Sequence, residues 1–193
     1  MLQVKNLFVD LGGFRLTADF EIERGSLISI VGPSGAGKST ILNALAGFIP
    51  LTSGVIKWNG SDITKLDPGL RPLSILFQDY NLFSHLTVKD NIAIGLRPNL
   101  KLDDLETELV NSVIEEVGLS KFKFIKPFQL SGGQRTRVSL ARSIVRSKPI
   151  LLLDEAFSGL GPALRSEMIK LIKDKSLKAV SYTHLTLPTK RIV

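Results

Sequence analysis

A glycine-rich segment near the N-terminus has the residue types and the spacing of a phosphate-binding loop. The segment GPSGAGKST matches the pattern G-x-x-x-x-G-K-[ST]. Its residues are Gly32, Pro33, Ser34, Gly35, Ala36, Gly37, Lys38, Ser39 and Thr40. Glycines let the main chain curl so that successive N–H groups face phosphate oxygens, and a following helix adds the positive end of its dipole. Lys38 can reach the β- and γ-phosphates, and the Ser39 hydroxyl can ligate Mg²⁺. The segment therefore predicts a site for a nucleotide and its metal ion.

A second segment, ILLLDEAF, places two acidic residues directly after an apolar run. The run 150–153 predicts a buried strand, and open α/β sheets bind ligands beyond the carboxyl ends of their strands. We expect Asp154 to hold Mg²⁺ through its water shell and Glu155 to polarise the attacking water. The alternative, that the acids only keep the strand end soluble, is weakened by the phosphate loop in the same chain.

Short strands must position these residues. Residues 2–9 alternate as a strand, and period-two apolar residues over 14–22 predict a second strand, joined to the first at Gly12-Gly13 as an antiparallel hairpin. The apolar run 27–31 predicts a buried strand that leads into the phosphate loop, which a helix follows.

Three further helices are predicted from capping residues. One begins at Asp103-Asp104 and ends at Gly118, one is capped by Ser131 and runs to Ser147, and one begins at Pro162. The apolar face of the first carries Leu105, Leu109, Val110, Val113, Ile114 and Val117. Strands alternating with helices predict an α/β fold with a parallel sheet, preceded by an antiparallel β piece.

Composition limits the possible classes of function. The chain has 193 residues, which suits one domain, and it has no cysteine, which excludes a disulfide framework and a thiolate site. No apolar run reaches the ~18 residues that a membrane span needs, and the segment MLQVKNLFVD has no signal-peptide core. The net charge of +7 comes from scattered Lys and Arg. We therefore expect a solvated basic surface, no nucleic-acid partner, and membrane association only through another protein.

The segment LSGGQRTRVSLARSIV, residues 130–145, is a second glycine-rich helix start. It opens with Ser131, Gly132, Gly133 and Gln134. A helix N-terminus with two glycines makes a second anion site by the same dipole effect. One chain that binds one ATP does not need two such sites.

Together with Gln78 in LFQD, these motifs resemble those of the ABC transporter ATPase family in order and approximate spacing, over residues 1–178. The resemblance implies a P-loop NTPase core with an N-terminal antiparallel β subdomain and an inserted helical subdomain over about 80–147. It also implies a head-to-tail homodimer that holds two ATP molecules. Each ATP would lie between residues 32–40 of one subunit and 131–134 of the other.

The resemblance also implies roles and partners. Gln78 would touch Mg²⁺ and the attacking water, and Glu155 would be the general base. Closing on ATP and opening after hydrolysis would rock a transmembrane permease, fed by a solute-binding protein. The ATPase would then lie at the cytoplasmic face of the bacterial inner membrane.

Within the family, segments 71–96, 97–102 and 162–168 are most similar to the ATPase subunits of bacterial thiamine importers, although importers of iron, sulfate and polyamines carry similar segments. Two other classes stay open. One is a soluble ABC ATPase acting on DNA or ribosomes, a class that usually has two cassettes in one chain or a long coiled coil between Gln78 and the signature segment. The other is a degenerate cassette that binds ATP without turnover.

Four positions depart from the family's pattern. They are Leu11, near where an aromatic ring stacks on adenine; Thr136, for a common Gln; Ala156, for Pro; and Gly161, for an Asp that contacts the opposite subunit. Phe14 or Phe8 would have to replace the ring, since its loss removes stacking energy of about 1–3 kcal/mol.

The segment AVSYTHLTLPTKRIV, residues 179–193, imitates the family's next strand and its catalytic-switch histidine through His184. Its apolar run is too thin for a central strand, and a sequencing-library adapter can encode it. We expect the native sequence to end near Lys178, residues 180–193 to be translated adapter, and the domain to be C-terminally truncated. His184 is accordingly not a candidate site residue.

Overall fold

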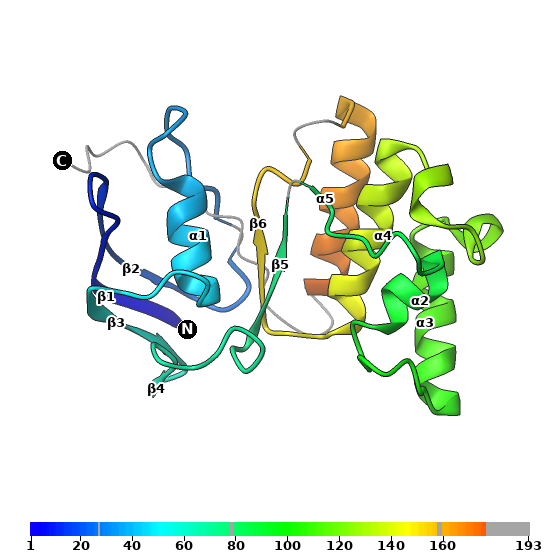
Figure 1. The fold of residues 1–193 in the computed structure, drawn as a ribbon, viewed down its shortest axis with the longest axis horizontal. Helices are drawn as coiled ribbons and strands as arrows, with labels where there is room; N and C mark the ends of the chain where they lie inside the picture. The colour runs from blue at the N-terminus through cyan, green and yellow to red at the C-terminus, as the bar shows by residue number, and fades with distance from the viewer. Residues whose placement is uncertain (27, 78, 158–159, 177–193) are drawn as a thin grey trace. The chain divides into compact units, whose positions relative to one another are not determined.

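The computed structural model describes residues 1–26, 28–77, 79–157 and 160–176 (Figure 1). Two predicted features, Gln78 and the segment 179–193 with His184, lie outside these residues. The chain forms two compact units. Unit 1 includes Met1–Ser74 and Pro149–Asp154, and unit 2 comprises Ile75–Lys148 and Glu155–Lys175.

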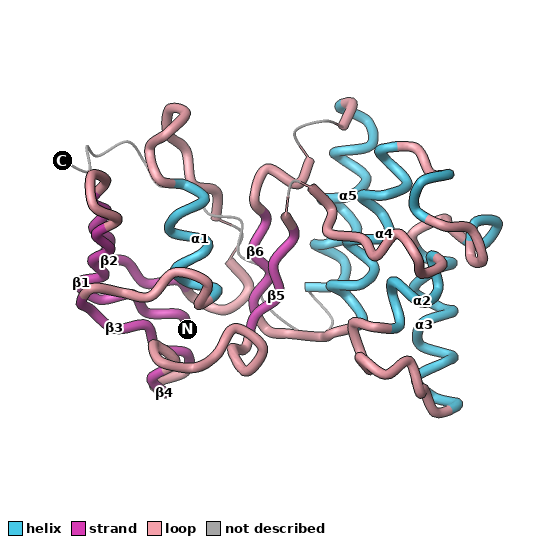
Figure 2. Tube along the Cα trace, in the orientation of Figure 1, coloured by secondary structure: helices cyan, strands magenta, loops and turns pink. Residues whose placement is uncertain are grey.

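Unit 1 contains a four-stranded antiparallel sheet with the strand order β2-β1-β3-β4 (Figure 2). Its strands are β1 (Leu2–Asp10), β2 (Arg15–Ile22), β3 (Ser53–Trp58) and β4 (Ser61–Asp62). The turn between β1 and β2 is closed by a hydrogen bond of 3.0 Å from the Leu11 N–H to the Phe14 carbonyl. The predicted hairpin is confirmed, with Gly12 in the turn at a φ of +74°.

Strand β1 is irregular at its centre. Leu2 and Val4 are buried, the register then shifts, and Leu7 and Val9 are buried instead of the next alternate residue. Both neighbouring strands shift their pairing there, as at a β-bulge. A Cβ on Gly54 of β3 would fall 2.3 Å from a carbonyl oxygen of the bulge, so only glycine fits beside it.

Helix α1 (Lys38–Ala46) follows the glycine-rich loop, as the sequence predicts. Its inner face buries Ile41, Leu42 and Leu45. The predicted strand before the loop was wrong for the residues that are described. Residues 28–31 have no strand assignment, and Val31 is 58% exposed. An apolar run forms a strand only where a neighbouring strand completes its hydrogen-bond ladder.

A second, parallel sheet pairs β5 (Leu73–Leu76) with β6 (Ile150–Leu153). The residues of β6 from Ile150 to Leu152 are at most 1% exposed. The predicted buried strand over 150–153 is confirmed. Asp154 directly follows the carboxyl end of this strand. The observed architecture is the predicted α/β class.

Unit 2 is helical, and its helices lie side by side (Figure 1). They are α2 (Val88–Ala93), α3 (Asp104–Glu116), α4 (Gly132–Val145) and α5 (Pro162–Ser176), with 3₁₀ turns at Ser120–Phe122 and Pro127–Gln129. The predicted starts of α3, α4 and α5 are confirmed. In the part of the chain that is described, no helix has the length and the apolar character to span a bilayer.

The apolar face predicted for α3 is narrower than expected. Val110, Val113 and Ile114 are at most 1% exposed, whereas Leu105 is 77% and Leu109 is 42% exposed. Because a helix turns by about 100° per residue, Leu109 and Leu105 lie roughly 90° and 130° around the axis from the centre of the three buried residues. The prediction that they belong to the packed face was wrong.

Candidate nucleotide-binding site

The phosphate loop enters α1 through residues that only glycine adopts easily. Gly37 is the N-cap of α1 with a φ of +89°, and Gly35 has a φ of +79°. No side chain in the described part of the chain caps the helix, so its first N–H groups remain available to an anion. The stretch 33–36 is exposed. This is the geometry of a loop that binds a ligand with its main chain.

Lys38 folds back over the loop that precedes it. Its Nζ donates hydrogen bonds of 2.9 Å to the Gly32 carbonyl and 2.9 Å to the Pro33 carbonyl. The ammonium group therefore spans the curl in which phosphate oxygens are expected, and it brings a positive charge to the site.

Ser39 and Asp154, two of the three residues predicted to hold a metal ion, are brought together. The Ser39 Oγ donates a hydrogen bond of 2.8 Å to the Asp154 Oδ1, across 115 residues of sequence. A hydroxyl and a carboxylate are the hard oxygen ligands that Mg²⁺ prefers, so the pair fits this ion. Among the described residues, no group of three or more His, Asp or Glu could hold a metal by itself. Phosphate oxygens of a nucleotide would have to complete the coordination.

Glu155 follows Asp154 in a left-handed conformation. Its φ is +47°, which is rare for a residue with a long side chain and costs on the order of 1–3 kcal/mol. Its side chain is exposed. A strained, exposed carboxylate directly after a buried strand is consistent with a role in chemistry. The predicted role of Gln78 stays a prediction, since it lies outside the described residues.

An aromatic ring lies against the phosphate loop. A Cβ on Gly37 would fall 2.7 Å from Cζ of Phe14, so the ring covers this glycine directly. Leu11 is 53% exposed in the hairpin turn, and Phe8 is half-buried in β1. Of the three, Phe14 is therefore the residue that the structure brings to the loop.

The signature segment is built differently. Ser131 is the N-cap of α4, and its Oγ accepts a hydrogen bond of 3.3 Å from the Gln134 N–H. The Gln134 Oε1 in turn accepts one of 2.8 Å from the Ser131 N–H. This capping box holds the helix start rigid. Gly132 has room for a side chain, since a Cβ there would lie 3.7 Å from its nearest neighbour. Its glycine is not required by packing within the described structure.

Arg71 was missed by the sequence analysis. Its side chain is 3% exposed and donates hydrogen bonds of 2.6–3.0 Å to four carbonyl oxygens. They belong to Ala44, Leu45, Thr64 and Leu66. Burial lowers the pKa of this guanidinium below its usual value. The cation anchors the C-terminal end of α1, opposite the phosphate loop, and no local sequence pattern announces that role.

Comparison with known proteins agrees with this geometry. A family model described as ABC transporter matches residues 17–158. The chain therefore belongs to the ABC transporter family and binds ATP.

Individual relatives are similar over most of the chain. A protein named thiamine import ATP-binding protein ThiQ from Ruegeria sp. (strain TM1040) is 48% identical over 174 residues, 90% of this chain and 75% of the relative. Proteins of the same name from Histophilus somni (strain 129Pt) and Aliivibrio fischeri (strain ATCC 700601 / ES114) are 50% and 49% identical. The match to the Histophilus somni protein covers 95% of this chain and 87% of the relative. The match to the Aliivibrio fischeri protein covers 86% of this chain and 73% of the relative.

Family membership makes the chain an ATPase whose activity is coupled to transport. It is a peripheral, membrane-associated subunit that works with a membrane permease.

Proposed function

We propose that this chain is the ATP-hydrolysing subunit of a bacterial thiamine importer, at the cytoplasmic face of the inner membrane. The observation that carries the proposal is the identity of about half the residues, over most of the chain, with proteins named for thiamine import. The open phosphate loop, with Lys38 folded over it and Ser39 beside Asp154, supports it. Residues 1–178 would form the nucleotide-binding domain.

The proposed working unit is a homodimer with two ATP sites, served from outside by a solute-binding protein. In each site residues 32–40 of one copy hold the triphosphate, and residues 131–134 of the other copy approach it from the opposite side. Gly132 supports this arrangement, because its missing side chain leaves the start of α4 accessible although packing does not demand it.

Ser39 and Asp154 would hold Mg²⁺ together with phosphate oxygens of ATP. The ion, when bound, would neutralise charge that develops on the phosphates. Gln78 is proposed to contact the ion and the attacking water.

Hydrolysis requires a water molecule in line with the γ-phosphate. The Glu155 carboxylate would accept a proton from this water while the water oxygen bonds to the γ-phosphorus. The bond from the γ-phosphorus to the bridging oxygen then breaks, and the bond's electron pair leaves with ADP. Lys38 and the N–H groups at the start of α1 would stabilise the negative charge that spreads over the phosphate oxygens.

The test is reconstitution of the chain with its permease and solute-binding protein in lipid vesicles. We expect ATP hydrolysis that rises when thiamine-loaded binding protein is added, together with thiamine uptake that Glu155→Gln abolishes. Stimulation by a different solute would contradict the thiamine assignment. ATP binding without turnover in the complete complex would instead establish a degenerate cassette.

A further inference from the structure

The segment KFKFIKPF, residues 121–128, joins α3 to α4 and combines basic with aromatic side chains. Phe124 is 75% exposed and Phe128 is 72% exposed. A connection between two helices gains nothing from two phenylalanine rings in water, because apolar surface is more stable when it is buried. Exposed apolar side chains that are gathered in one place and bordered by polar ones mark an interaction surface. The segment is therefore a candidate binding surface.

The main chain of this segment is held in place. The N–H groups of Val88 and Lys89, at the start of α2, donate hydrogen bonds of 2.8 and 2.9 Å to two of its carbonyls. On either side of it, Leu119 and Leu130 are buried. The two exposed rings therefore project from a preformed surface, and little conformational entropy would be lost when they bind.

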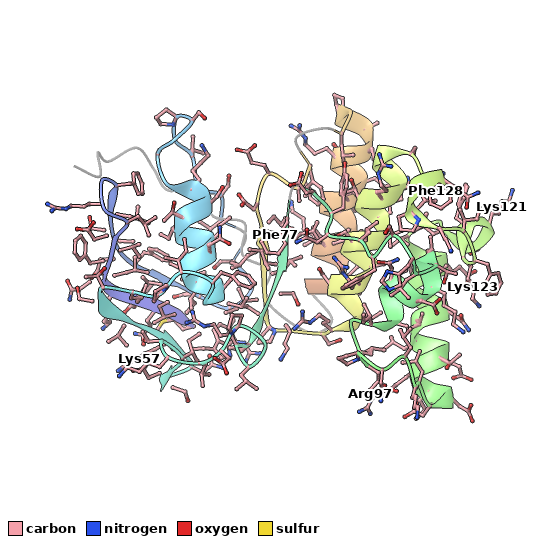
Figure 3. The ribbon with its side chains drawn as sticks, in the orientation of Figure 1. Lys57, Phe77, Arg97, Lys121, Lys123 and Phe128 are labelled. Atoms are coloured by element: carbon pink, nitrogen blue, oxygen red, sulfur yellow. The ribbon has the colours of Figure 1, made fainter. Side chains whose placement is uncertain are left out.

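Three lysines give the segment a positive charge. Lys121 and Lys126 are exposed, and the Nζ of Lys123 lies 5.4 Å from the centre of the Phe124 ring. Figure 3 shows Lys121 and Lys123 on this segment. None of the three takes part in the ion pairs that form among the described residues. The sequence also has no acidic residue over 117–153, so the charge is not neutralised by sequence neighbours.

This combination fits the surface of an anionic membrane. Lysines are attracted to the headgroup phosphates of anionic lipids, and aromatic rings insert at the boundary between headgroups and acyl chains. A protein partner fits less well, because lysine is depleted in protein–protein interfaces. Nucleic acid would suit the same residue types. The chain is a membrane-associated subunit, however, and this location brings it close to lipid headgroups.

We propose that residues 121–128 form a membrane-surface patch that binds anionic phospholipid headgroups. The ammonium groups would contact headgroup phosphates, and the rings of Phe124 and Phe128 would insert beside them. This contact with lipid would act in addition to the attachment through the permease. It goes beyond the proposed function and does not depend on which solute is transported.

The first test measures binding of the full chain to lipid vesicles by sedimentation. The vesicles contain phosphatidylcholine alone or equal parts of phosphatidylcholine and phosphatidylglycerol. The double variant Lys121→Gln/Lys126→Gln is compared with Lys101→Gln/Lys170→Gln. The control lysines are exposed residues of the same unit, and both double variants change the net charge equally. Thermal unfolding checks that all variants fold.

We expect the chain to bind the anionic vesicles and to bind the neutral vesicles only weakly. A lysine close to an anionic surface contributes about fivefold in affinity. Loss of Lys121 and Lys126 should therefore lower the affinity for anionic vesicles at least about tenfold, whereas the control should stay within about twofold. Binding should also weaken as the salt concentration rises, because salt screens exposed charges.

The second test asks whether the rings enter the lipid. Phe128→Trp is compared with Leu105→Trp, because Leu105 is 77% exposed on α3 of the same unit. The fluorescence of Trp58, the single tryptophan of the unmutated chain, is subtracted from both. With vesicles that contain brominated phosphatidylcholine and phosphatidylglycerol, we expect strong quenching for Phe128→Trp and little for Leu105→Trp.

Equal affinities of the two double variants for anionic vesicles would overturn the inference, and so would equal quenching at positions 128 and 105. If Lys121→Gln/Lys126→Gln loses association with the permease in detergent while its vesicle binding is unchanged, the surface serves a protein partner instead. If the same variant loses only binding to a single-stranded oligonucleotide, the surface serves nucleic acid. Either result would contradict the lipid assignment.

Discussion

The phosphate loop and the signature segment are both glycine-rich starts of helices, yet the N-termini of the two helices are capped differently. At the phosphate loop the N-cap is Gly37 with a φ of +89°, and no described side chain caps α1. At the signature segment Ser131 and Gln134 form a capping box. The first N–H groups of α1 therefore remain available to a ligand. At the start of α4, the capping box provides hydrogen-bond acceptors for some of the N–H groups.

The two starts also differ in their charged neighbours. At the phosphate loop the Lys38 ammonium donates a hydrogen bond to a carbonyl of the loop. The Ser39 hydroxyl donates one to the Asp154 carboxylate. No acidic residue occurs in the sequence between Glu116 and Asp154, so α4 begins far from any acidic sequence neighbour that could hold a metal ion. The phosphate loop therefore has the groups that we propose to hold the nucleotide and its metal ion. The signature segment lacks them, and under the proposed function it would complete the ATP site of another copy.

The largest expected effect is at the phosphate loop. Lys38→Ala removes the positive charge over the loop, and turnover should fall on the order of 10²–10³-fold, as when a donor to a developing anion is deleted. Steady-state ATP hydrolysis measures this. Lys57→Ala is the matched control, because this lysine lies on β3 of the same unit (Figure 3). A small effect of Lys38→Ala would mean that the loop does not hold the reacting phosphates.

Asp154→Asn should act through the metal ion. The substitution keeps the shape but removes the charge beside Ser39, and the Mg²⁺ concentration for half-maximal turnover should rise about 10–100-fold. A Mg²⁺ titration at saturating ATP measures it. Asp62→Asn, an exposed carboxylate in β4, should leave the titration unchanged. Equal curves for both variants would remove Asp154 from the metal site.

At the signature segment the expected effect on activity and the effect on stability have opposite directions. Gly132→Ala should reduce turnover on the order of tenfold or more by displacing the second copy from the phosphate. It should leave the unfolding temperature unchanged or raise it, because alanine is the better helix former by up to about 1 kcal/mol.

Gly133→Ala gives the contrast within the same segment. Its Cβ would fall 2.6 Å from Cδ2 of Leu164, so some stability should be lost with the activity. Full activity of a stable Gly132→Ala protein would show that the glycine serves no ligand.

The smallest effect is expected at Gly161. A Cβ there meets no described residue within 4 Å, so among those residues the Asp that the family usually carries fits without repacking. Gly161→Asp should raise turnover by at most about fivefold, since an exposed charge adds no more than about 1 kcal/mol. The assay is ATP hydrolysis against protein concentration, because a contact between copies matters most in dilute solution. A rise that is equal at all concentrations would contradict a role between copies.

What the sequence could predict was mainly local. Capping residues within three positions of each other, such as Asp103 with Glu106 and Ser131 with Gln134, correctly gave the starts of α3 and α4. The phosphate loop and β6 were found for the same reason, since a short pattern determines their conformation. The contact between Ser39 and Asp154 could be predicted because both motifs were expected to hold the same Mg²⁺ ion.

What the sequence could not predict depends on distant partners. Strand formation over 28–31 failed because an apolar run does not reveal whether a neighbouring strand is present. Arg71 and Arg142 look like surface residues in the sequence, yet both are held by carbonyl groups from other segments. Only the three-dimensional structure shows which carbonyl groups accept hydrogen bonds from these arginines.

The most direct test of the two-region comparison is complementation between two inactive variants. Lys38→Ala damages the phosphate loop, and Gly132→Asp places a negative charge where the signature segment should meet phosphate. Asp at a helix start is compatible with folding, because it is favourable near the positive end of the dipole. An equal mixture of the two proteins is assayed for ATP hydrolysis, with each protein alone as the control.

If each ATP lies between two copies, about half of the dimers are mixed, and each mixed dimer has one site with two intact halves. We therefore expect recovery of about a quarter of the unmutated activity from two proteins that are inactive alone. No recovery above the sum of the separate proteins would contradict the central claim, since loop and signature segment would then not serve a shared site.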